Sequence, residues 1–155
     1  MSARGEARLA SEKLYREAAT LSDYQLSCFR IAAISGPERN PVNSMRAGRY
    51  PLIEDGSRFT NRIHVEDLVR VLYQAINYKE DLPPAINCSS GKSYPAIEML
   101  EYLAKKYDLG LPERVSLEEI RARGWGTMLS NQQVSNQLLV DLFPDAIQYP
   151  DLTWM

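Results

Sequence analysis

The residue types that most often carry chemistry are scarce in this sequence. His64 is the only histidine, and Cys28 and Cys88 are the only two cysteines, among 155 residues. A serine hydrolase would have a single candidate base, and a zinc site would need cysteine and carboxylate ligands at spacings that the chain does not offer. The two cysteines lie far apart without a CxxC pair, which is typical of buried thiols in a reduced compartment. We therefore expect no metal site.

Charge and composition argue against two further classes of function. The formal net charge is −2 at pH 7, whereas a nucleic-acid binder needs a basic stripe that displaces counterions from phosphates. No apolar run approaches the length of a membrane span, and no signal-peptide hydrophobic region follows Met1, so a cytoplasmic location is expected. Because 45% of the residues are hydrophobic and 25% are charged, one domain over residues 1–155 is the prediction.

The N-terminal half of the sequence predicts a helix, a buried strand and a hairpin. Apolar residues recur at helical spacing over residues 6–20. Residues 24–34 form a nearly continuous apolar run, which is typical of a strand buried on both faces in a parallel sheet. Two short strand-like runs at 50–53 and 59–63 flank Asp55-Gly56, and this pair is a strong signal for a β-hairpin.

The C-terminal half predicts more helix than strand. The clearest amphipathic helix covers residues 65–77, and a short strand is expected at 85–89. Ser93 is expected to cap a helix that has Pro95 in its first turn and extends to Tyr107. Two further helices are expected, a short one with a Ser116 and Glu119 capping box and a last one carrying Val134, Leu138, Leu139 and Leu142. This order is α/β in type, but it has few strands for a complete doubly wound sheet.

Several segments resemble the extended short-chain dehydrogenase/reductase family, the NAD-dependent epimerase/dehydratases, and particularly its atypical NAD(P)-binding members. These are FRIAAISGP (29–37), RIHVEDLVRVLYQAI (62–76), SSGKSYPAIEMLEYLA after Asn87, and NQQVSNQLL followed by QYPD. The IHVED junction is the most specific of them. The resemblance implies the C-terminal, substrate-side portion of a Rossmann-type doubly wound fold, with few parallel strands, a β-hairpin and a helical substrate-binding subdomain. The N-terminal nucleotide-binding half is expected to be absent.

The sequence departs from this family where the family keeps its catalytic machinery. None of the eight glycines belongs to a GxxGxxG turn between a strand and a helix, which would hold a pyrophosphate. In the family's YxxxK motif, Lys13 as the lysine places Leu9 at the tyrosine position. The alternative register places Arg8 at the lysine position and Arg4 at the tyrosine position. Because neither register supplies a phenol, no catalytic residue is predicted in this chain.

The resemblance nevertheless implies site residues. Ala33, Ile34 and Ser35 would line the nicotinamide end of NAD or NADP, although the chain alone is not expected to bind that cofactor. Ser35 stands where the family usually has a tyrosine. The three residues are cofactor-binding candidates only in the presence of the missing half, because that half holds the family's nucleotide site.

Candidate substrate-binding residues cluster before the helix at 65–77. Thr60 stands where the nucleotide-sugar epimerases have a phosphate-binding arginine, and Arg58 and Arg62 flank it. A guanidinium fork suits phosphate or carboxylate, and the alternative is a pair of solvated arginines. His64 could face a substrate or hydrogen-bond a neighbouring loop, and the structural role is favoured.

Two functions follow as hypotheses. The first is an NAD(P)-dependent epimerase, dehydratase or reductase-like protein acting on a sugar nucleotide or similar small polar substrate, truncated and inactive alone. The second is a non-catalytic remnant that serves as a small-molecule-binding or protein-interaction module. Either predicts an open sheet edge, and hence self-association or a partner chain that supplies the missing half. Trp125 and Trp154 could stack on a base or sugar, although packing is the commoner role.

Overall fold

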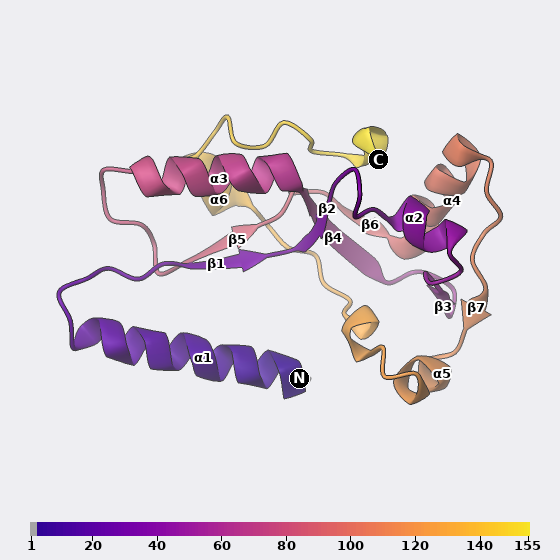
Figure 1. Ribbon diagram of the computed structural model, residues 1–155, viewed down its shortest axis with the longest axis horizontal. Coiled ribbons are helices and arrows are strands. Elements are labelled where there is room, and N and C mark those ends of the chain that lie inside the picture. Colours follow the sequence, from indigo (N-terminus) through magenta and orange to yellow (C-terminus); the bar gives the residue numbers. More distant parts are fainter. Residues whose placement is uncertain (1–2) are drawn as a thin grey trace.

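The computed structural model describes residues 3–155 and contains three small sheets connected and flanked by helices (Figure 1). The elements in chain order are α1 (Ala3–Thr20), β1 (Cys28–Ile31), β2 (Ala33–Ser35), α2 (Pro41–Arg46), β3 (Leu52–Ile53), β4 (Phe59–His64), α3 (Val65–Asn77), β5 (Ala85–Cys88), β6 (Ser93–Pro95), α4 (Ala96–Tyr107), β7 (Arg114–Val115), α5 (Leu117–Ala122), η1 (Gly126–Leu129), α6 (Gln137–Leu142) and η2 (Leu152–Trp154).

Parallel pairing dominates the sheets. β1 pairs with β5, β2 pairs with β4, and β3 pairs with β7, all in parallel. The one antiparallel pair joins β4 to β6, with Thr60 opposite Tyr94. Parallel strands need crossover connections, and helices such as α3 supply them. The α/β class predicted from the sequence is therefore confirmed.

The predicted hairpin around Asp55-Gly56 is wrong. Its two arms do not pair with each other, because β3 pairs with β7 whereas β4 pairs with β2 and β6. A tight turn does form, in which the Gly56 amide donates to the Ile53 carbonyl at 2.9 Å. The Gly56 carbonyl then accepts from the Ile97 amide at 3.0 Å, so the turn joins α4 to β3 and the strands diverge.

The predicted strand over residues 24–34, buried on both faces, is wrong in its extent and its burial. The strand begins at Cys28 and is interrupted at Ala32 between β1 and β2. Arg30 and Ile31 are exposed. Among the described residues only β5 pairs with β1, so nothing covers its other edge.

Two helix starts also differ from the prediction. Ser93 lies in β6 and not at a helix start, because its hydroxyl donates to Asn61 Oδ1 of the neighbouring β4 at 2.5 Å. Pro95 is the N-cap of α4 rather than a residue of its first turn. Val134 lies outside α6, which begins at Gln137.

Two of the helix predictions are confirmed. Helix α3 spans Val65–Asn77, with Leu68 and Val71 buried. Helix α5 carries the complete capping box, in which Ser116 and Glu119 satisfy each other's backbone amides. In both cases the pattern that predicts the helix, apolar periodicity or a capping box, lies within a few consecutive residues.

Three apolar clusters hold the molecule together. The first joins α3, β5 and α6 through Ile63, Leu68, Val71, Ile86, Cys88, Leu139, Phe143 and Ala146. The second joins α2 and α4 to the C-terminal segment through Val42, Leu52, Met99, Leu100, Leu103 and Met155. The third joins β3, β7 and α5 through Ile53, Val115 and Ile120. Ile63 of β4 belongs to the first cluster.

Candidate functional site

One face of β4 forms the floor of a narrow cleft. Side chains alternate along a strand, so Thr60, Arg62 and His64 point to the same side. All three line the cleft. Its walls come from later parts of the chain, namely Ser90, Lys92 and Tyr94 before and within β6, and Tyr149, Asp151, Leu152, Trp154 and Met155 of the C-terminal segment.

Arg62 is held rigidly at the centre of this floor. Its Nη1 donates to Ser35 Oγ at 2.7 Å, and its Nη2 donates to the Tyr50 hydroxyl at 3.0 Å. Its Nε is buried and has no hydrogen-bond partner in the part of the chain that the structure describes. An unpaired buried donor is costly, and an acceptor supplied by a ligand would relieve that cost.

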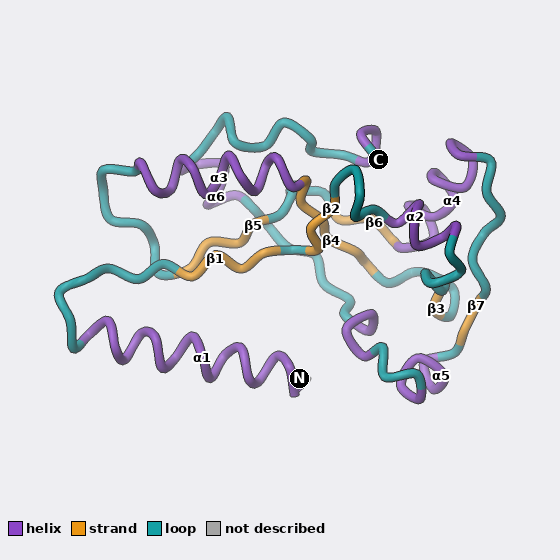
Figure 2. Tube along the Cα trace, in the orientation of Figure 1, coloured by secondary structure: helices purple, strands orange, loops and turns teal. Residues whose placement is uncertain are grey.

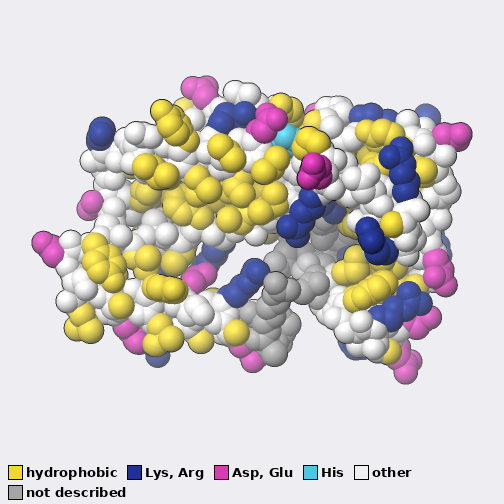
Figure 3. Space-filling view, in the orientation of Figure 1, with side chains coloured by type: hydrophobic (Ala, Val, Ile, Leu, Met, Phe, Trp, Pro, Cys, Tyr) yellow, Lys and Arg dark blue, Asp and Glu magenta, His cyan; other side chains and the backbone are white. Residues whose placement is uncertain are grey.

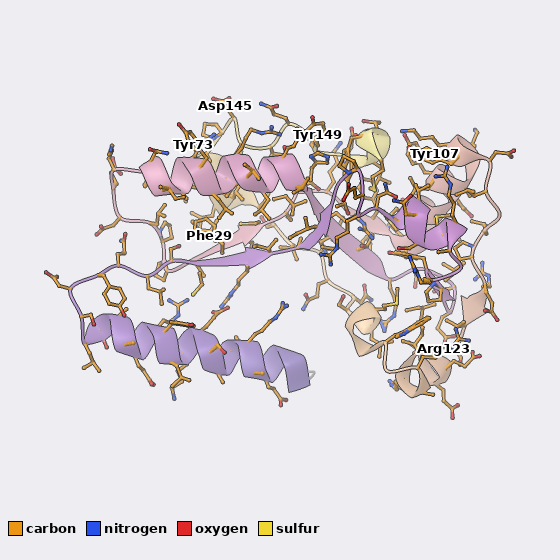
Figure 4. The ribbon with its side chains drawn as sticks, in the orientation of Figure 1. Phe29, Tyr73, Tyr107, Arg123, Asp145 and Tyr149 are labelled. Carbon is orange, nitrogen blue, oxygen red and sulfur yellow. The ribbon has the colours of Figure 1, made fainter. Side chains whose placement is uncertain are left out.

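His64 serves the fold and also lines the cleft. Its Nδ1 accepts from the Glu66 amide at 3.3 Å and so caps α3. Its ring lies 4.0 Å from the Tyr149 ring and 4.5 Å from the Trp154 ring, centroid to centroid. Figure 4 shows Tyr149 beside the N-terminal end of α3. The C-terminal segment therefore packs on His64 as the upper wall of the cleft.

Side chains of both charges line the cleft. Lys92 has a side chain 56% exposed and lies 3.9 Å from Asp151. Asp151 is turned towards Thr153, whose hydroxyl donates to it at 2.6 Å. Hydrogen bonds from Thr153, together with the charge of Lys92, hold the pKa of the Asp151 carboxyl below its usual value. Arg62 and Lys92 are the cationic side chains of this lining, and Asp151 is its carboxylate side chain.

The phenols of the cleft stay protonated at neutral pH. Burial, and then the charge of Asp151, raise the pKa of Tyr94. The hydrogen bond that Tyr149 donates to Glu66 Oε2 at 2.9 Å raises the pKa of Tyr149. Neither phenol is therefore prepared to act as a base.

The structure separates the two arginines that the sequence singled out. Arg62 lines the cleft, whereas Arg58 is half-buried and does not line it. The Arg58 carbonyl accepts from the Ala96 amide at 2.8 Å, which ties this residue to the start of α4. Sequence reasoning missed Lys92 and Tyr94, because their segment was interpreted as a helix start rather than as a strand paired with β4.

The cofactor candidates lie together on β2. Ala33 is exposed, Ile34 is half-buried, and Ser35 is fully buried with its hydroxyl accepting from Arg62. Because β2 pairs with β4 in register, Ser35 lies opposite His64. The candidate cofactor residues and the cleft floor are thus neighbours on one sheet.

A second cleft lies on the other side of Tyr50. It holds about 150 Å³ and is lined by Met45, Gly48, Tyr50, Pro51, Pro112, Glu113, Arg123 and Trp125. The Arg123 guanidinium lies over the Trp125 ring at 5.4 Å. Tyr50 contributes to this cleft and reaches Arg62 with its hydroxyl, so it connects the two sites. The first cleft holds only about 10 Å³, which is room for about one water.

Residues 3–155 show neither a metal-binding cluster nor a helix suited to span a membrane. No set of three or more histidine, cysteine, aspartate or glutamate side chains in this range is arranged to hold a metal ion. Within the same range no helix has both the length and the apolar character that crossing a membrane requires.

Comparisons with solved structures identify the fold. No family model and no curated protein matches the sequence. A conserved protein of unknown function from Silicibacter pomeroyi DSS matches 98% of this chain at 26% identity, with a TM-score of 0.78. A human epimerase family protein solved with NADPH matches 84% at 18% identity, with a TM-score of 0.67.

The UDP-glucuronic acid 4-epimerase of Bacillus cereus, solved with UDP-glucuronic acid and NAD, matches 90% of this chain at 15% identity, with a TM-score of 0.67. The fold is that of the C-terminal part of a Rossmann-like epimerase. The chain covers 53%, 46% and 46% of these three structures, about half of each. The prediction of the C-terminal portion of a Rossmann-type α/β fold is therefore confirmed, and the predicted site residues stay predictions.

Proposed function

We propose that this chain is the substrate-side portion of an NAD(P)-dependent epimerase, dehydratase or reductase-like protein, and that its cleft binds a sugar nucleotide or a similar small anionic molecule. The observation that carries the proposal is the Arg62 guanidinium on the floor of a cleft that Lys92 also lines, because the buried Nε of Arg62 has no hydrogen-bond partner among residues 3–155. The fold shared with an epimerase solved with UDP-glucuronic acid supports the substrate class. A guanidinium with a free donor is suited to one phosphate or carboxylate oxygen.

The second cleft supplies a surface for the base or sugar ring. Trp125 and Tyr50 line it, and aromatic faces stack on planar or apolar rings. Because Tyr50 also bonds Arg62, a ligand with its anion at Arg62 and its ring beside Trp125 would extend along Tyr50. The first cleft is too narrow for such a ligand as it stands, so binding requires Tyr149 and Trp154 to shift outward.

The residues present do not fit the pyrophosphate of a dinucleotide. Gly36, the one glycine at the end of β2, lies so close to α3 that an added Cβ would stand 2.7 Å from Val65 Cγ1. Its amide donates to the Arg39 carbonyl at 2.9 Å rather than pointing to an open cradle. The start of α3 is capped by His64 and packed against Tyr149. We therefore propose that Ala33, Ile34 and Ser35 meet the cofactor only when another structural unit holds its phosphates.

Catalysis by this chain alone is not part of the proposal. With Lys13 taken as the lysine of YxxxK, Leu9 stands at the tyrosine position. Lys13 itself pairs with Glu17 at 3.7 Å on the exposed side of α1. A second candidate function is a non-catalytic module that binds the same anionic ligands. It is favoured because Leu9 stands where the YxxxK motif has its tyrosine.

Calorimetric titration with UDP-glucuronic acid and with NADPH tests the proposal. We expect binding of the sugar nucleotide and none of NADPH by the chain alone. Arg62→Gln should weaken binding about 10- to 100-fold because a charge-assisted hydrogen bond is lost. Lys92→Gln, at a side chain that is 56% exposed, should weaken it about 3- to 10-fold with no cost to folding.

Arg58→Gln is the matched control, because Arg58 lies on the same strand-turn segment but outside the cleft. The dissociation constant of Arg58→Gln should stay within about twofold of the wild-type value. The anion site is refuted if neither Arg62→Gln nor Lys92→Gln binds more weakly than Arg58→Gln. Micromolar binding of NADPH by the chain alone would contradict the need for a second unit.

A further inference from the structure

The C-terminal segment, residues 148–155, is tied firmly to the protein at its start. The amides of Gln148 and Tyr149 donate at 3.0 and 3.1 Å to the fully buried carboxylate of Asp67. The Arg70 guanidinium pairs with the same carboxylate and lies 5.5 Å from the centre of the Tyr149 ring. Because hydrogen bonds to a charged group are stronger than those between neutral groups, residues 148–149 form an anchor.

The remainder of the segment, residues 151–155, is held by more exposed groups. Lys106 Nζ of α4 donates at 2.8 and 2.6 Å to the main-chain oxygens of Thr153 and Met155. Both Lys106 and Thr153 are exposed, and water competes for partners such as these. Within residues 151–155 only Met155 is buried. We call these five residues the lid, because they are held more weakly than the anchor.

The lid presents the carboxylate of Asp151 to the cleft. Asp151 Oδ1 accepts from the Thr153 amide at 3.0 Å and from the Thr153 hydroxyl at 2.6 Å, and so it caps η2. Asp151 Oδ2 lies 3.9 Å from Lys92 Nζ. Lys92 and Asp151 both line the cleft, together with Arg62. The lid thus places its own carboxylate against a cation that would otherwise be free for the anion of a ligand.

The lid also fills the cleft. Four of its five residues line the space, namely Asp151, Leu152, Trp154 and Met155. The Trp154 ring lies 4.5 Å from the His64 ring, centroid to centroid. In Figure 3 only a small patch of the histidine, in cyan, is visible between its neighbours, and His64 is 5% exposed. About 10 Å³ is left, so a ligand larger than about one water does not enter while the lid is closed.

We propose that the lid is autoinhibitory: Asp151 occupies Lys92 in place of a ligand's anion, and the lid leaves the cleft when a phosphate or carboxylate replaces Asp151 there. The chain turns between Tyr149 and Asp151, because the anchor stays on α3. Trp154 leaves with the lid, and the Tyr149 ring swings outward from an amide that does not move. The class of ligand rests on the proposed function, whereas the anchor, the lid and the Lys92 contact do not.

Loosening the lid should tighten binding, since a ligand binds more weakly in proportion to the fraction of the protein that is closed to it. Lys106→Met removes the donor that holds the lid, at a residue that does not line the cleft. We expect calorimetric titration to show UDP-glucuronic acid binding about 3- to 10-fold more tightly. Loss of a positive charge by itself would weaken the binding of an anion, so a gain in affinity identifies the lid.

Lys105→Met is the matched control. Lys105 is the exposed neighbour of Lys106 in the last turn of α4, and the substitution removes the same charge. The dissociation constant of Lys105→Met should stay within about twofold of the wild-type value.

Asp151→Asn tests the contact between the lid and Lys92. Asparagine keeps an oxygen that accepts from the Thr153 amide, but it lacks the charge that faces Lys92. We expect the affinity for UDP-glucuronic acid to rise about 3- to 10-fold. In a Lys92→Gln background the same substitution should change the affinity less than about twofold, because the cation that Asp151 occupies is then absent. An equal gain in both backgrounds would mean that Asp151 acts by general repulsion, which overturns the proposal.

Amide hydrogen exchange on the chain alone tests the lid without a ligand. The amides of Thr153 and Met155 in the lid should be at least about tenfold less protected than those of Gln148 and Tyr149 in the anchor. Lys106→Met should lower the protection of the lid amides further and leave the anchor amides unchanged.

Three outcomes decide between the alternatives. Equal protection of lid and anchor amides overturns the proposal. So does a Lys106→Met protein that binds UDP-glucuronic acid no more tightly than Lys105→Met does. If neither the wild type nor any variant binds UDP-glucuronic acid, the proposed function is refuted, and the exchange contrast by itself then supports or overturns the lid.

Discussion

Asp67 is the residue that ties the C-terminal segment to the site. Its fully buried carboxylate accepts from the Gln148 amide at 3.0 Å and the Tyr149 amide at 3.1 Å, and it also pairs with Arg70. Figure 2 shows the loop after α6 passing along α3 before it reaches η2. Since Tyr149 packs on His64, the carboxylate in the first turn of α3 also positions the upper wall of the cleft.

Replacement of Asp67 by Asn should therefore loosen that segment. We expect a loss of about 2–4 kcal/mol in the free energy of unfolding, because a buried network of hydrogen bonds loses acceptors and the Arg70 charge loses its partner. Urea unfolding followed by Trp154 fluorescence in a Trp125→Phe background measures it. Asp145→Asn, at an exposed aspartate near the same segment, should stay within about 0.5 kcal/mol. A loss below 1 kcal/mol at Asp67 would show that the segment is held by its aromatic contacts.

Cys88 should make stability depend on pH in the alkaline range. Burial raises the pKa of its thiol from an ordinary value of 9.0 to about 11. The folded state thus holds the thiol proton more tightly than the unfolded chain does. The contribution of the Cys88 thiol to the free energy of unfolding is therefore complete below pH 9 and is lost as the pH rises towards 11.

The difference in unfolding free energy between the wild type and Cys88→Ala should accordingly shrink from pH 8 to pH 11. Other alkaline groups are common to both proteins and cancel in this difference. Alkylation gives an independent check, because the half-buried Cys28 should react at pH 8 long before the buried Cys88 does. Equal alkylation rates would contradict the burial of Cys88.

At the scale of elements, the turn at Gly56 decides where β3 and β4 go. Gly56 has φ +78°, and an added Cβ would stand 2.6 Å from Leu52 Cδ1 and 2.7 Å from Ile97 Cβ. The left-handed conformation and the contact with α4 both require glycine. The turn thus packs α4 on β3. For this reason β3 and β4 diverge after the Asp55-Gly56 turn instead of forming the predicted hairpin.

Gly56→Ala should cost about 2–4 kcal/mol of unfolding free energy, since strain in the backbone adds to a clash in the core. Gly110→Ala is the matched control, because nothing lies within 4 Å of its added Cβ and its φ is not in the left-handed region. It should be neutral or stabilise by up to about 1 kcal/mol. Thermal unfolding of the two variants side by side measures the contrast, and equal values would show that the turn is not tightly packed.

At the scale of the whole molecule, the open surface around β1 should limit the stability of the isolated chain. Exposed apolar side chains on α1, β1 and α3 forgo burial that contributes roughly 25 cal/mol per Å². We expect the midpoint of thermal unfolding to rise with protein concentration, because association through this surface stabilises the folded state by mass action. Sedimentation and calorimetry over a hundredfold range of concentration measure this. A sharp, concentration-independent transition of a monodisperse monomer would contradict it.

Local features of this protein follow from its sequence alone. The 65–77 helix, the Ser116 and Glu119 capping box and the α/β class were predicted correctly, because periodicity and caps are written within a few consecutive residues. The sequence also singled out Arg62 and His64, which lie two positions apart on one strand. The substrate-binding role predicted for Arg62 is what the titration tests, whereas His64 has the structural role of capping α3.

The cleft itself was decided by tertiary structure. Lys92, Tyr149 and Trp154 line the same cleft as Arg62 although tens of residues separate them from it in the sequence. No local sequence pattern predicts such an arrangement. The same holds for β4, whose partners β2 and β6 lie on either side of it in the sheet and replace the predicted hairpin. Pairing between distant segments depends on which apolar faces cover each other. Such pairing is a property of the folded chain as a whole. It places Arg62 in the cleft and Arg58 outside it, although only four positions separate them in the sequence.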